Sequence, residues 1–236
     1  MDLLGKALLD FYQEQSKGPL RSHSSLGNVE EVPVSYFFRP FPTMPKIEQE
    51  ALLQCRGSVL DIGCGAGSHC LYLQDSGLDC TGLDSSPEGI QVATQRGVFK
   101  TVCTDILNFQ SGTYDTLLLL MNGIGIAGSL GAFPKFLKHL KGLLKPGGQI
   151  LMDSSDLIYM FDTDDDGGVW IPAEMEYYGE VRYKWEYSGN FGPEFQWLFL
   201  DLQTLSEQAS NAGFQVEWIK NGPHFDYLAR LTPIPK

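Results

Sequence analysis

The sequence predicts a doubly wound α/β fold, in which helices cover both faces of a mainly parallel sheet. Three observations support this prediction. Apolar runs alternate with helical patterns over residues 58–153, one of these runs is apolar on both faces, and a glycine-rich turn joins the first run to a helix. Such alternation produces parallel sheets flanked by helices. Residues 114–121 form the doubly apolar run and suit a central strand.

The N-terminal part of the chain precedes this alternation. Residues 1–16 carry apolar side chains at helical spacing, which predicts a helix. Residues 17–44 are rich in Ser, Gly and Pro, so we expect an extended loop there. Pro45 suits the first turn of a second helix, which Gly57 ends.

The alternating part supplies five expected strands and three expected helices. The strands are expected at residues 58–62, 79–83, 99–103, 114–121 and 149–153, and the helices at residues 68–75, 87–96 and 133–144.

The last third of the chain has a different pattern. Residues 178–187 alternate between apolar and polar side chains, which predicts a half-exposed antiparallel strand. A helix is expected at residues 202–212, where Gly213 ends it. Residues 214–220 and 225–231 then predict two strands joined by a tight turn.

The composition excludes several classes of partner. The chain has 236 residues, with 17 Lys and Arg against 29 Asp and Glu, and its net charge is −12. An acidic surface repels phosphate backbones and anionic lipid, so we expect neither nucleic acid nor membrane as a partner. No apolar run approaches the ~20 residues of a membrane helix, and the N-terminus lacks a signal-peptide pattern. The five cysteines contain no Cys-x-x-Cys pair, which favours reduced thiols in a cytoplasmic protein over a zinc site.

The strongest motif is VLDIGCGAGS at residues 59–68. It runs from an expected strand through Gly63, Gly65 and Gly67 into a helix. Glycines at such a turn let backbone N–H groups and the helix N-terminus approach a ligand closely. Several nucleotide-binding families share a turn of this kind, so the motif alone does not identify the ligand.

Four further features narrow the choice of ligand. Asp61 lies inside the strand, two residues before the first glycine of the motif. Asp84 lies at the end of the second strand, nineteen residues past Gly65, where a carboxylate can bind two ribose hydroxyls. Asp105 and Ile106 follow the third strand, and LKPGGQILMD at residues 144–153 leads into the fifth.

Together these features resemble the class I S-adenosylmethionine-dependent methyltransferases. The resemblance covers residues 54–153 by motif and extends through the terminal strand–turn–strand by topology. It implies the Rossmann-like methyltransferase fold, a seven-stranded sheet with an antiparallel last strand. It divides the chain into an N-terminal helix and cap segment at residues 1–45 and a methyltransferase domain at residues 46–236. Within that domain, residues 160–200 would form a β insertion on the substrate side.

The resemblance also implies S-adenosylmethionine as cofactor, S-adenosylhomocysteine as product, and a small-molecule O, N or C atom as methyl acceptor. Asp61 would orient the glycine-rich turn and approach the amino group of the cofactor. The backbone of Gly63, Cys64 and Gly65 would face its methionine and ribose parts, with Gly67 opening the helix behind them.

The remaining cofactor contacts come from three strand ends. By the same resemblance, Asp84 would hold the ribose and Ser85 would lie beside the adenine. Asp105 would meet the adenine amino group, and Ile106 would pack on the ring. Asn122, after the fourth strand, would lie near the methionine end, although Asn-Gly is also a common plain turn.

Two other classes of protein fit part of the pattern. A nicotinamide-dependent oxidoreductase shares the glycine-rich turn and the acidic residue, but its usual spacing is G-x-G-x-x-G, not the G-x-G-x-G found here. A non-catalytic protein that binds S-adenosylmethionine would carry the same motifs.

The candidate general base is His224, because imidazole titrates near neutrality and the expected turn reaches the active edge of the sheet. A structural or surface histidine is the alternative. Asp153, which leaves the fifth strand at the same edge, is a second candidate for the catalytic role.

The aromatic segment VSYFFRPF, residues 34–41, is expected to cap the pocket. Tyr36 is a further catalytic candidate, while Phe37 and Arg39 are candidates for substrate binding. Alternatively, these rings pack the N-terminal helix onto the domain. Trp185 in the insertion is another candidate for substrate binding, or else part of a satellite core.

Two expectations complete the interpretation. Asp162, Asp164 and Asp166 alternate before Gly167 as in a calcium loop, but Ala173 occupies the twelfth position, so we expect a solvated acidic loop and no metal. The N-terminal helix and the alternating strand are available for self-association, so the chain is expected to be a monomer or a homodimer.

Overall fold

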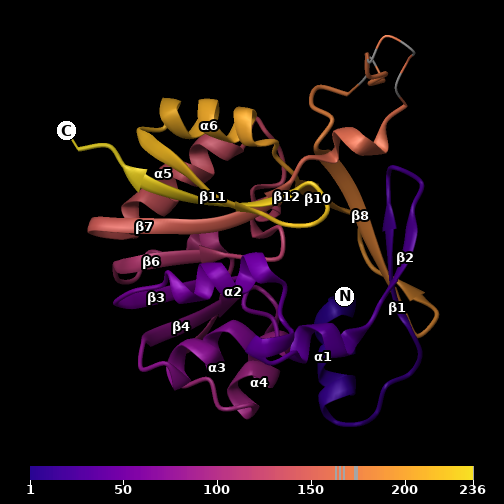
Figure 1. Cartoon of the computed structure of the whole chain (residues 1–236). Coiled ribbons are helices and arrows are strands. Elements are labelled where there is room, and N and C mark those ends of the chain that lie inside the picture. Colours follow the sequence, from indigo (N-terminus) through magenta and orange to yellow (C-terminus); the bar gives the residue numbers. More distant parts are fainter. Residues whose placement is uncertain (163, 165, 167, 173–174, 236) are drawn as a thin grey trace.

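The computed structural model describes residues 1–162, 164, 166, 168–172 and 175–235. Its main sheet has seven strands in the order β11-β12-β7-β6-β3-β4-β5 (Figure 1). The pairs among β3 to β7 are parallel, and β12 runs antiparallel to both β7 and β11. This confirms the predicted doubly wound sheet with an antiparallel last strand. The strands are β3 (Ser58–Ile62), β4 (Asp79–Asp84), β5 (Thr101–Cys103), β6 (Tyr114–Leu119), β7 (Leu144–Ser155), β11 (Phe214–Asn221) and β12 (Asp226–Pro233).

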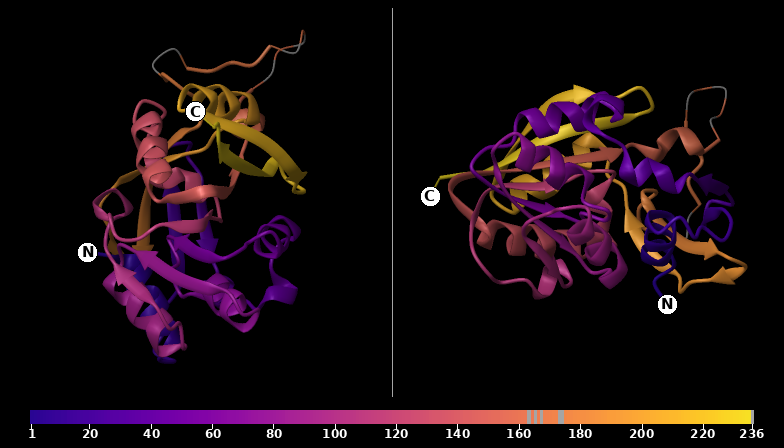
Figure 2. Two further views of the ribbon diagram at one scale, coloured as in Figure 1. Left: turned by 90° about the vertical axis from the view of Figure 1, so that its left-hand side faces the viewer. Right: turned by 90° about the horizontal axis from the view of Figure 1, so that it is seen from below.

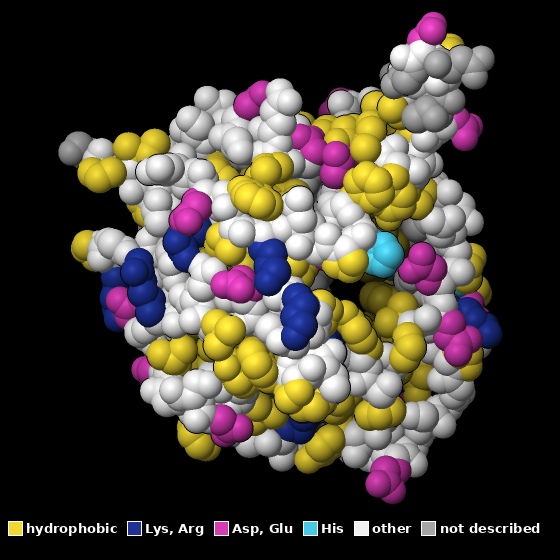
Figure 3. Space-filling view, in the orientation of Figure 1, with side chains coloured by type: hydrophobic (Ala, Val, Ile, Leu, Met, Phe, Trp, Pro, Cys, Tyr) yellow, Lys and Arg dark blue, Asp and Glu magenta, His cyan; other side chains and the backbone are white. Residues whose placement is uncertain are grey.

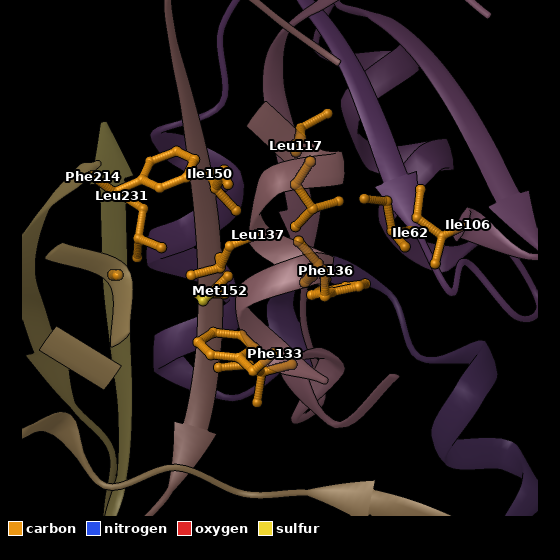
Figure 4. Packing of buried hydrophobic residues seen from close by; sticks show 14 of the residues in the cluster. Ile62, Ile106, Leu117, Phe133, Phe136, Leu137, Ile150, Met152, Phe214 and Leu231 are labelled. Carbon is orange, nitrogen blue, oxygen red and sulfur yellow. The ribbon is translucent and has the colours of Figure 1, made fainter. Parts of the chain in front are cut away.

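Helices cover both faces of this sheet, as Figure 2 shows from two further sides. On one face, α5 and α6 pack into the largest core cluster, where Phe133, Phe136 and Leu137 lie against Ile150 and Met152 (Figure 4). On the other face, α2, α3 and α4 form a second cluster. The helices are α2 (Lys46–Leu53), α3 (Ser68–Asp75), α4 (Pro87–Gln95), α5 (Phe133–Gly142) and α6 (Leu202–Asn211).

Successive side chains along β3 point to opposite faces of the sheet. Leu60 and Ile62 belong to the α5 and α6 face, whereas Val59 belongs to the α2 and α3 face. Asp61 therefore points toward α3, and its buried carboxylate accepts a hydrogen bond from Cys70 Sγ at 3.2 Å. None of the helices among the described residues is long and apolar enough to cross a membrane.

A second sheet lies beside the first, at the end of the molecule away from the C-terminus (Figures 1 and 2). Its order is β10-β8-β1-β2, with β9 paired to β8. The prediction of an extended loop over residues 17–44 is thus wrong in its first half. The strands of this sheet are β1 (Leu20–Ser24), β2 (Val29–Val32), β8 (Glu180–Tyr187), β9 (Asn190–Phe191) and β10 (Phe195–Leu198).

The reason for this difference is that β1 and β2 are short and mostly polar, reading LRSHS and VEEV. They carry no apolar alternation that would mark them as strands. They form because β8, more than 150 residues later, offers an edge on which Leu20 pairs with Tyr187. Two 3-10 helices, η1 (Val34–Phe38) and η2 (Phe41–Thr43), lead from this sheet to α2.

The N-terminal helix α1 (Leu3–Tyr12) joins the two sheets. On one side Leu3 and Ala7 pack with Leu20 and Tyr187 of the second sheet. On the other side Leu8 packs with Val92 of α4.

Tyr187 provides a test of this junction. Its ring is buried, and its hydroxyl donates to Asp10 Oδ2 at 3.2 Å and accepts from the Lys17 N–H at 3.0 Å. We expect Tyr187→Ala to lower the free energy of unfolding by about 3–5 kcal/mol through the cavity it leaves. Tyr187→Phe keeps the ring and should cost only about 1–2 kcal/mol for the lost hydrogen bonds. Urea unfolding measures both, and equal losses would contradict the assigned packing role.

Candidate functional site

The glycine-rich turn lies between β3 and α3. Gly63, Gly65 and Gly67 all have positive φ, at 80°, 50° and 80°. A Cβ on Gly67 would lie 2.7 Å from Val98 Cγ2, so this glycine allows close packing. A Cβ on Gly65 would meet nothing within 4 Å, so open space lies directly over the turn. The turn thus has the geometry that a closely approaching ligand requires.

Asp84, at the end of β4, reaches this turn. Its Oδ2 accepts from the Gly65 N–H and its Oδ1 from the Ser86 N–H, each at 2.8 Å. Burial raises the pKa of Asp84, and these two hydrogen bonds partly offset that effect. Each oxygen keeps a lone pair for a further donor. The structure therefore joins two predicted cofactor residues, while Ser85 between the strand and α4 is exposed.

The third strand end is arranged differently for its two predicted residues. Asp105 is exposed, and its Oδ1 accepts from the Leu107 N–H at 2.7 Å, which caps the 3-10 helix η3 (Ile106–Asn108). Ile106 is buried in the main core cluster, beside Ile62 in Figure 4. The proposed adenine contacts of both residues remain predictions.

The turn after β6 has an unusual backbone. Met121 and Asn122 both adopt positive φ, at 63° and 55°, whereas Gly123 does not. Both N–H groups donate to the buried carboxylate of Asp153, at 3.1 Å to Oδ2 and 2.8 Å to Oδ1. Burial, together with the negative charge of Glu48, raises the pKa of Asp153 to about 7. Asp153, near the end of β7, thus holds Asn122 in place. A plain Asn-Gly turn does not need such a contact.

A pocket of about 220 Å³ lies at this edge of the sheet. Tyr36 and Asp153, two of the catalytic candidates, both line it, and so does Asn122. Figure 3 shows the surface hollowed near the junction of the two sheets, with apolar side chains at the bottom. The lining residues are Tyr36, Pro45, Ile47, Glu48, Met121, Asn122, Asp153 and Asp226.

His224, the other catalytic candidate, is exposed and is not among these lining residues. Its backbone N–H donates to Asp226 Oδ1 at 2.8 Å, and Asp226 is the residue of this turn that lines the pocket. Asp226 was not among the residues predicted from the sequence, although the predicted topology placed its turn at this edge of the sheet.

The candidate substrate residues Phe37, Arg39 and Trp185 take other positions. Phe37 packs among apolar side chains of α1 and α4, and its carbonyl accepts from Ser68 Oγ at 2.7 Å. Arg39 is buried, with its guanidinium carbon 3.7 Å from the centroid of the Tyr36 ring. Trp185 packs in the cluster that joins α1 to the second sheet. These contacts match the packing alternative better than direct contact with a substrate.

Arg39 belongs to a series of four buried side chains of alternating charge, which was not predicted from the sequence. Arg39 Nη2 binds Glu48 Oε1 at 2.5 Å, and His69 Nε2 lies 2.9 Å from Glu48 Oε2. His69 Nδ1 is 3.9 Å from Asp61 Oδ1. All four side chains are buried. No spacing in the sequence indicates this series of charges, because its members come from a loop, α2, α3 and β3.

The charges along this series shift the pKa of its members. Burial alone would raise the pKa of Glu48, but His69 and Arg39 lower it below its usual value. Burial alone would lower the pKa of His69, but Asp61 and Glu48 raise it to about 9. At neutral pH the four side chains therefore alternate in charge from Arg39 to Asp61, as cation, anion, cation and anion.

The acidic loop lies partly outside the described residues. Gly167, Ala173 and Glu174 are in that part, so the calcium-loop comparison cannot be followed residue by residue. Over the rest of the chain that the structure describes, no group of three His, Cys, Asp or Glu side chains is placed to hold a metal ion.

Comparison with known proteins gives consistent matches. A family model described as "Methyltransferase domain" matches residues 39–218. The crystal structure of a SAM-dependent methyltransferase from Bacteroides fragilis, in complex with S-adenosyl-L-homocysteine, is 43% identical, with a TM-score of 0.91, over 99% of this chain and 95% of that one. A sugar N-methyltransferase from Streptoalloteichus shares the fold, at 16% identity and a TM-score of 0.57, over 84% of this chain and 88% of that one.

A curated relative matches over a shorter stretch. The 2-heptyl-1-hydroxyquinolin-4(1H)-one methyltransferase of Mycobacteroides abscessus is 33% identical over 88 residues, or 34% of this chain. That match spans 38% of the length of the relative.

The charged partners of His69 predict that the free energy of unfolding depends on pH. The pKa of His69 is raised in the folded protein, so its stabilising effect is complete below about pH 6.5 and is lost as the pH rises through about 9. We expect the difference in unfolding free energy between wild type and His69→Gln to shrink by roughly 3 kcal/mol over that range. Urea titrations at a series of pH values test this, because the comparison cancels the ionisation of groups that His69 does not influence. Parallel curves for the two proteins would contradict it.

Proposed function

From the premise that the chain belongs to the family of S-adenosylmethionine-dependent methyltransferases, we propose that it transfers a methyl group from this cofactor to a small-molecule O, N or C acceptor. One observation carries the proposal. The open turn at Gly65, the carboxylate of Asp84 and the pocket containing Asp153 all lie at the carboxyl edge of one parallel sheet. Ligands of open α/β sheets bind at this edge.

The residues around the turn fit the cofactor. The space over Gly65 admits a ligand against the backbone of Gly63 and Cys64, and Asp84 has lone pairs left for two ribose hydroxyls. Asp61 would complete the amino-group contact from its buried position beside α3. When bound, the cofactor would supply a methyl group whose carbon is electrophilic because it is attached to a sulfonium sulfur, the leaving group.

Asp153 is the catalytic candidate that we favour. A carboxylate with a pKa of about 7 suits the removal of a proton near neutral pH. It lines the pocket together with Tyr36, whose ring is fixed by the guanidinium of Arg39. An O–H or N–H acceptor in this pocket would give its proton to Asp153, directly or through water. His224 remains the alternative base if its turn closes over the pocket.

Two observations favour a small acceptor. The pocket is about 220 Å³, which is below the usual range for drug-sized ligands. The net charge of −12 opposes the approach of nucleic acid. The names of the relatives, a quinolone methyltransferase and a sugar N-methyltransferase, also describe small acceptors.

Binding calorimetry with S-adenosylhomocysteine tests the cofactor assignment. We expect Asp84→Ala to weaken binding by about 2 kcal/mol, the scale of losing hydrogen bonds to a charged group. Asp79→Ala is the matched control, since this exposed aspartate begins the same strand and pairs with Lys100. Tight binding of NAD without any response to S-adenosylhomocysteine would instead favour an oxidoreductase.

Turnover separates an enzyme from a non-catalytic binding protein. A metabolite screen with methyl-labelled cofactor should yield a labelled small molecule with the wild-type chain. With the Asp153→Asn variant, kcat should fall because the base is lost. The KM for the cofactor should rise by a smaller factor, because the amide oxygen can accept from only one of the two N–H groups of the turn. Binding of cofactor without transfer to any metabolite would reduce the proposal to cofactor binding.

A further inference from the structure

The turn at Met121 and Asn122 holds two successive non-glycine residues in the left-handed region. Such a backbone is unfavourable for residues with a Cβ and persists only where the surroundings impose it. Both residues also line the pocket. The contacts that hold this turn therefore decide the shape of one pocket wall.

Two strands supply these contacts. From β7, Asp153 accepts both N–H groups of the turn, and Ser155 Oγ donates to Asn122 Oδ1 at 3.0 Å. From β10 in the second sheet, Trp197 Nε1 donates to the carbonyl oxygen of Asn122 at 3.1 Å. Trp197 is thus a direct polar link from the insertion to the turn.

Packing reinforces this link. The 3-10 helix η4 (Gly123–Ala127) follows the turn, and the Trp197 indole lies against Gly125 within it. A Cβ on Gly125 would overlap this ring, and the indole Nε1 would be the atom nearest to it. Residue 125 must therefore be glycine for the ring to reach Asn122.

We propose that Trp197 is a positioning residue, which fixes Asn122 at the pocket wall and so couples the insertion sheet to the methionine end of the cofactor site. The proposal rests on the proposed function, because Asn122 lies near the methionine end of the cofactor only if the chain binds S-adenosylmethionine as its resemblance to the methyltransferases implies. Its consequence is linkage: a ligand that orders the turn also orders β10, and displacement of β10 weakens cofactor binding.

Trp197→Phe is the first test, because it keeps an aromatic ring beside Gly125 and removes the indole N–H. We expect the dissociation constant for S-adenosylhomocysteine to rise about 3- to 10-fold, the scale of one hydrogen bond, and Tm to fall by only about 2–4 °C. Trp218→Phe is the matched control. Its Nε1 also donates to an asparagine, Asn221 Oδ1 at 2.9 Å, but from an exposed position on β11. The control should leave the dissociation constant unchanged.

The indole N–H signals in ¹⁵N NMR provide a second readout, which a merely structural role would not move. The chain has four tryptophans, and the signal absent from Trp197→Phe identifies Trp197. Adding S-adenosylhomocysteine to the wild-type chain should shift this signal and leave that of Trp218 in place. If Trp197→Phe does not fold, Gly125→Ala takes its place, since the added methyl group displaces the indole and shifts its signal.

The outcomes are distinct. An unmoved Trp197 signal on binding, or an unchanged dissociation constant in a folded Trp197→Phe variant, overturns the positioning role while the proposed function stands. If the wild-type chain does not bind S-adenosylhomocysteine, the proposed function fails and this inference fails with it.

Discussion

The buried series of alternating charges from Arg39 to Asp61 is the constraint on which the site depends. Four charged side chains in the interior are stable only if each has a partner of opposite sign, because an uncompensated buried charge is strongly destabilising. Arg39 comes from the cap segment, Glu48 from α2, His69 from α3 and Asp61 from β3. Pairing them fixes these four segments relative to one another. The segment around Arg39 is therefore held against α2, α3 and β3 in a single arrangement.

Two carboxylates, Glu48 within this series of charges and Asp153 outside it, show how the neighbouring groups determine the protonation of a buried acid. Glu48 and Asp153 are both buried and both line the pocket. Glu48 contacts two cations, which lower its pKa despite burial. Burial and the negative charge of Glu48 raise the pKa of Asp153, and its hydrogen bonds from two neutral N–H groups only partly offset this effect. Similar burial thus produces one permanent anion and one group poised to exchange a proton near neutral pH.

In the second sheet, packing joins segments that lie far apart in the sequence, as the paired charges do around Glu48. Segments near the start of the chain and segments after residue 178 meet in β1 and β8, and α1 ties both to the main sheet. Through Trp197 this sheet also reaches the turn at Asn122. The pocket wall is thus shaped by parts of the chain that the glycine-rich motif does not include.

Local patterns in the sequence predicted the main sheet and the glycine-rich turn at its carboxyl edge. Apolar periodicity along each strand, the turn glycines and the acidic residues at strand ends are local features, and parallel strands bring their carboxyl ends to one edge. Asp84 therefore reaches the N–H group of Gly65. Only the tertiary structure decided β1 and β2, which are polar and form against a distant edge, and the partners of Arg39, Glu48, His69 and Trp197. Their contacts join residues far apart in the chain, and no periodicity records which side chains a folded core will bring together.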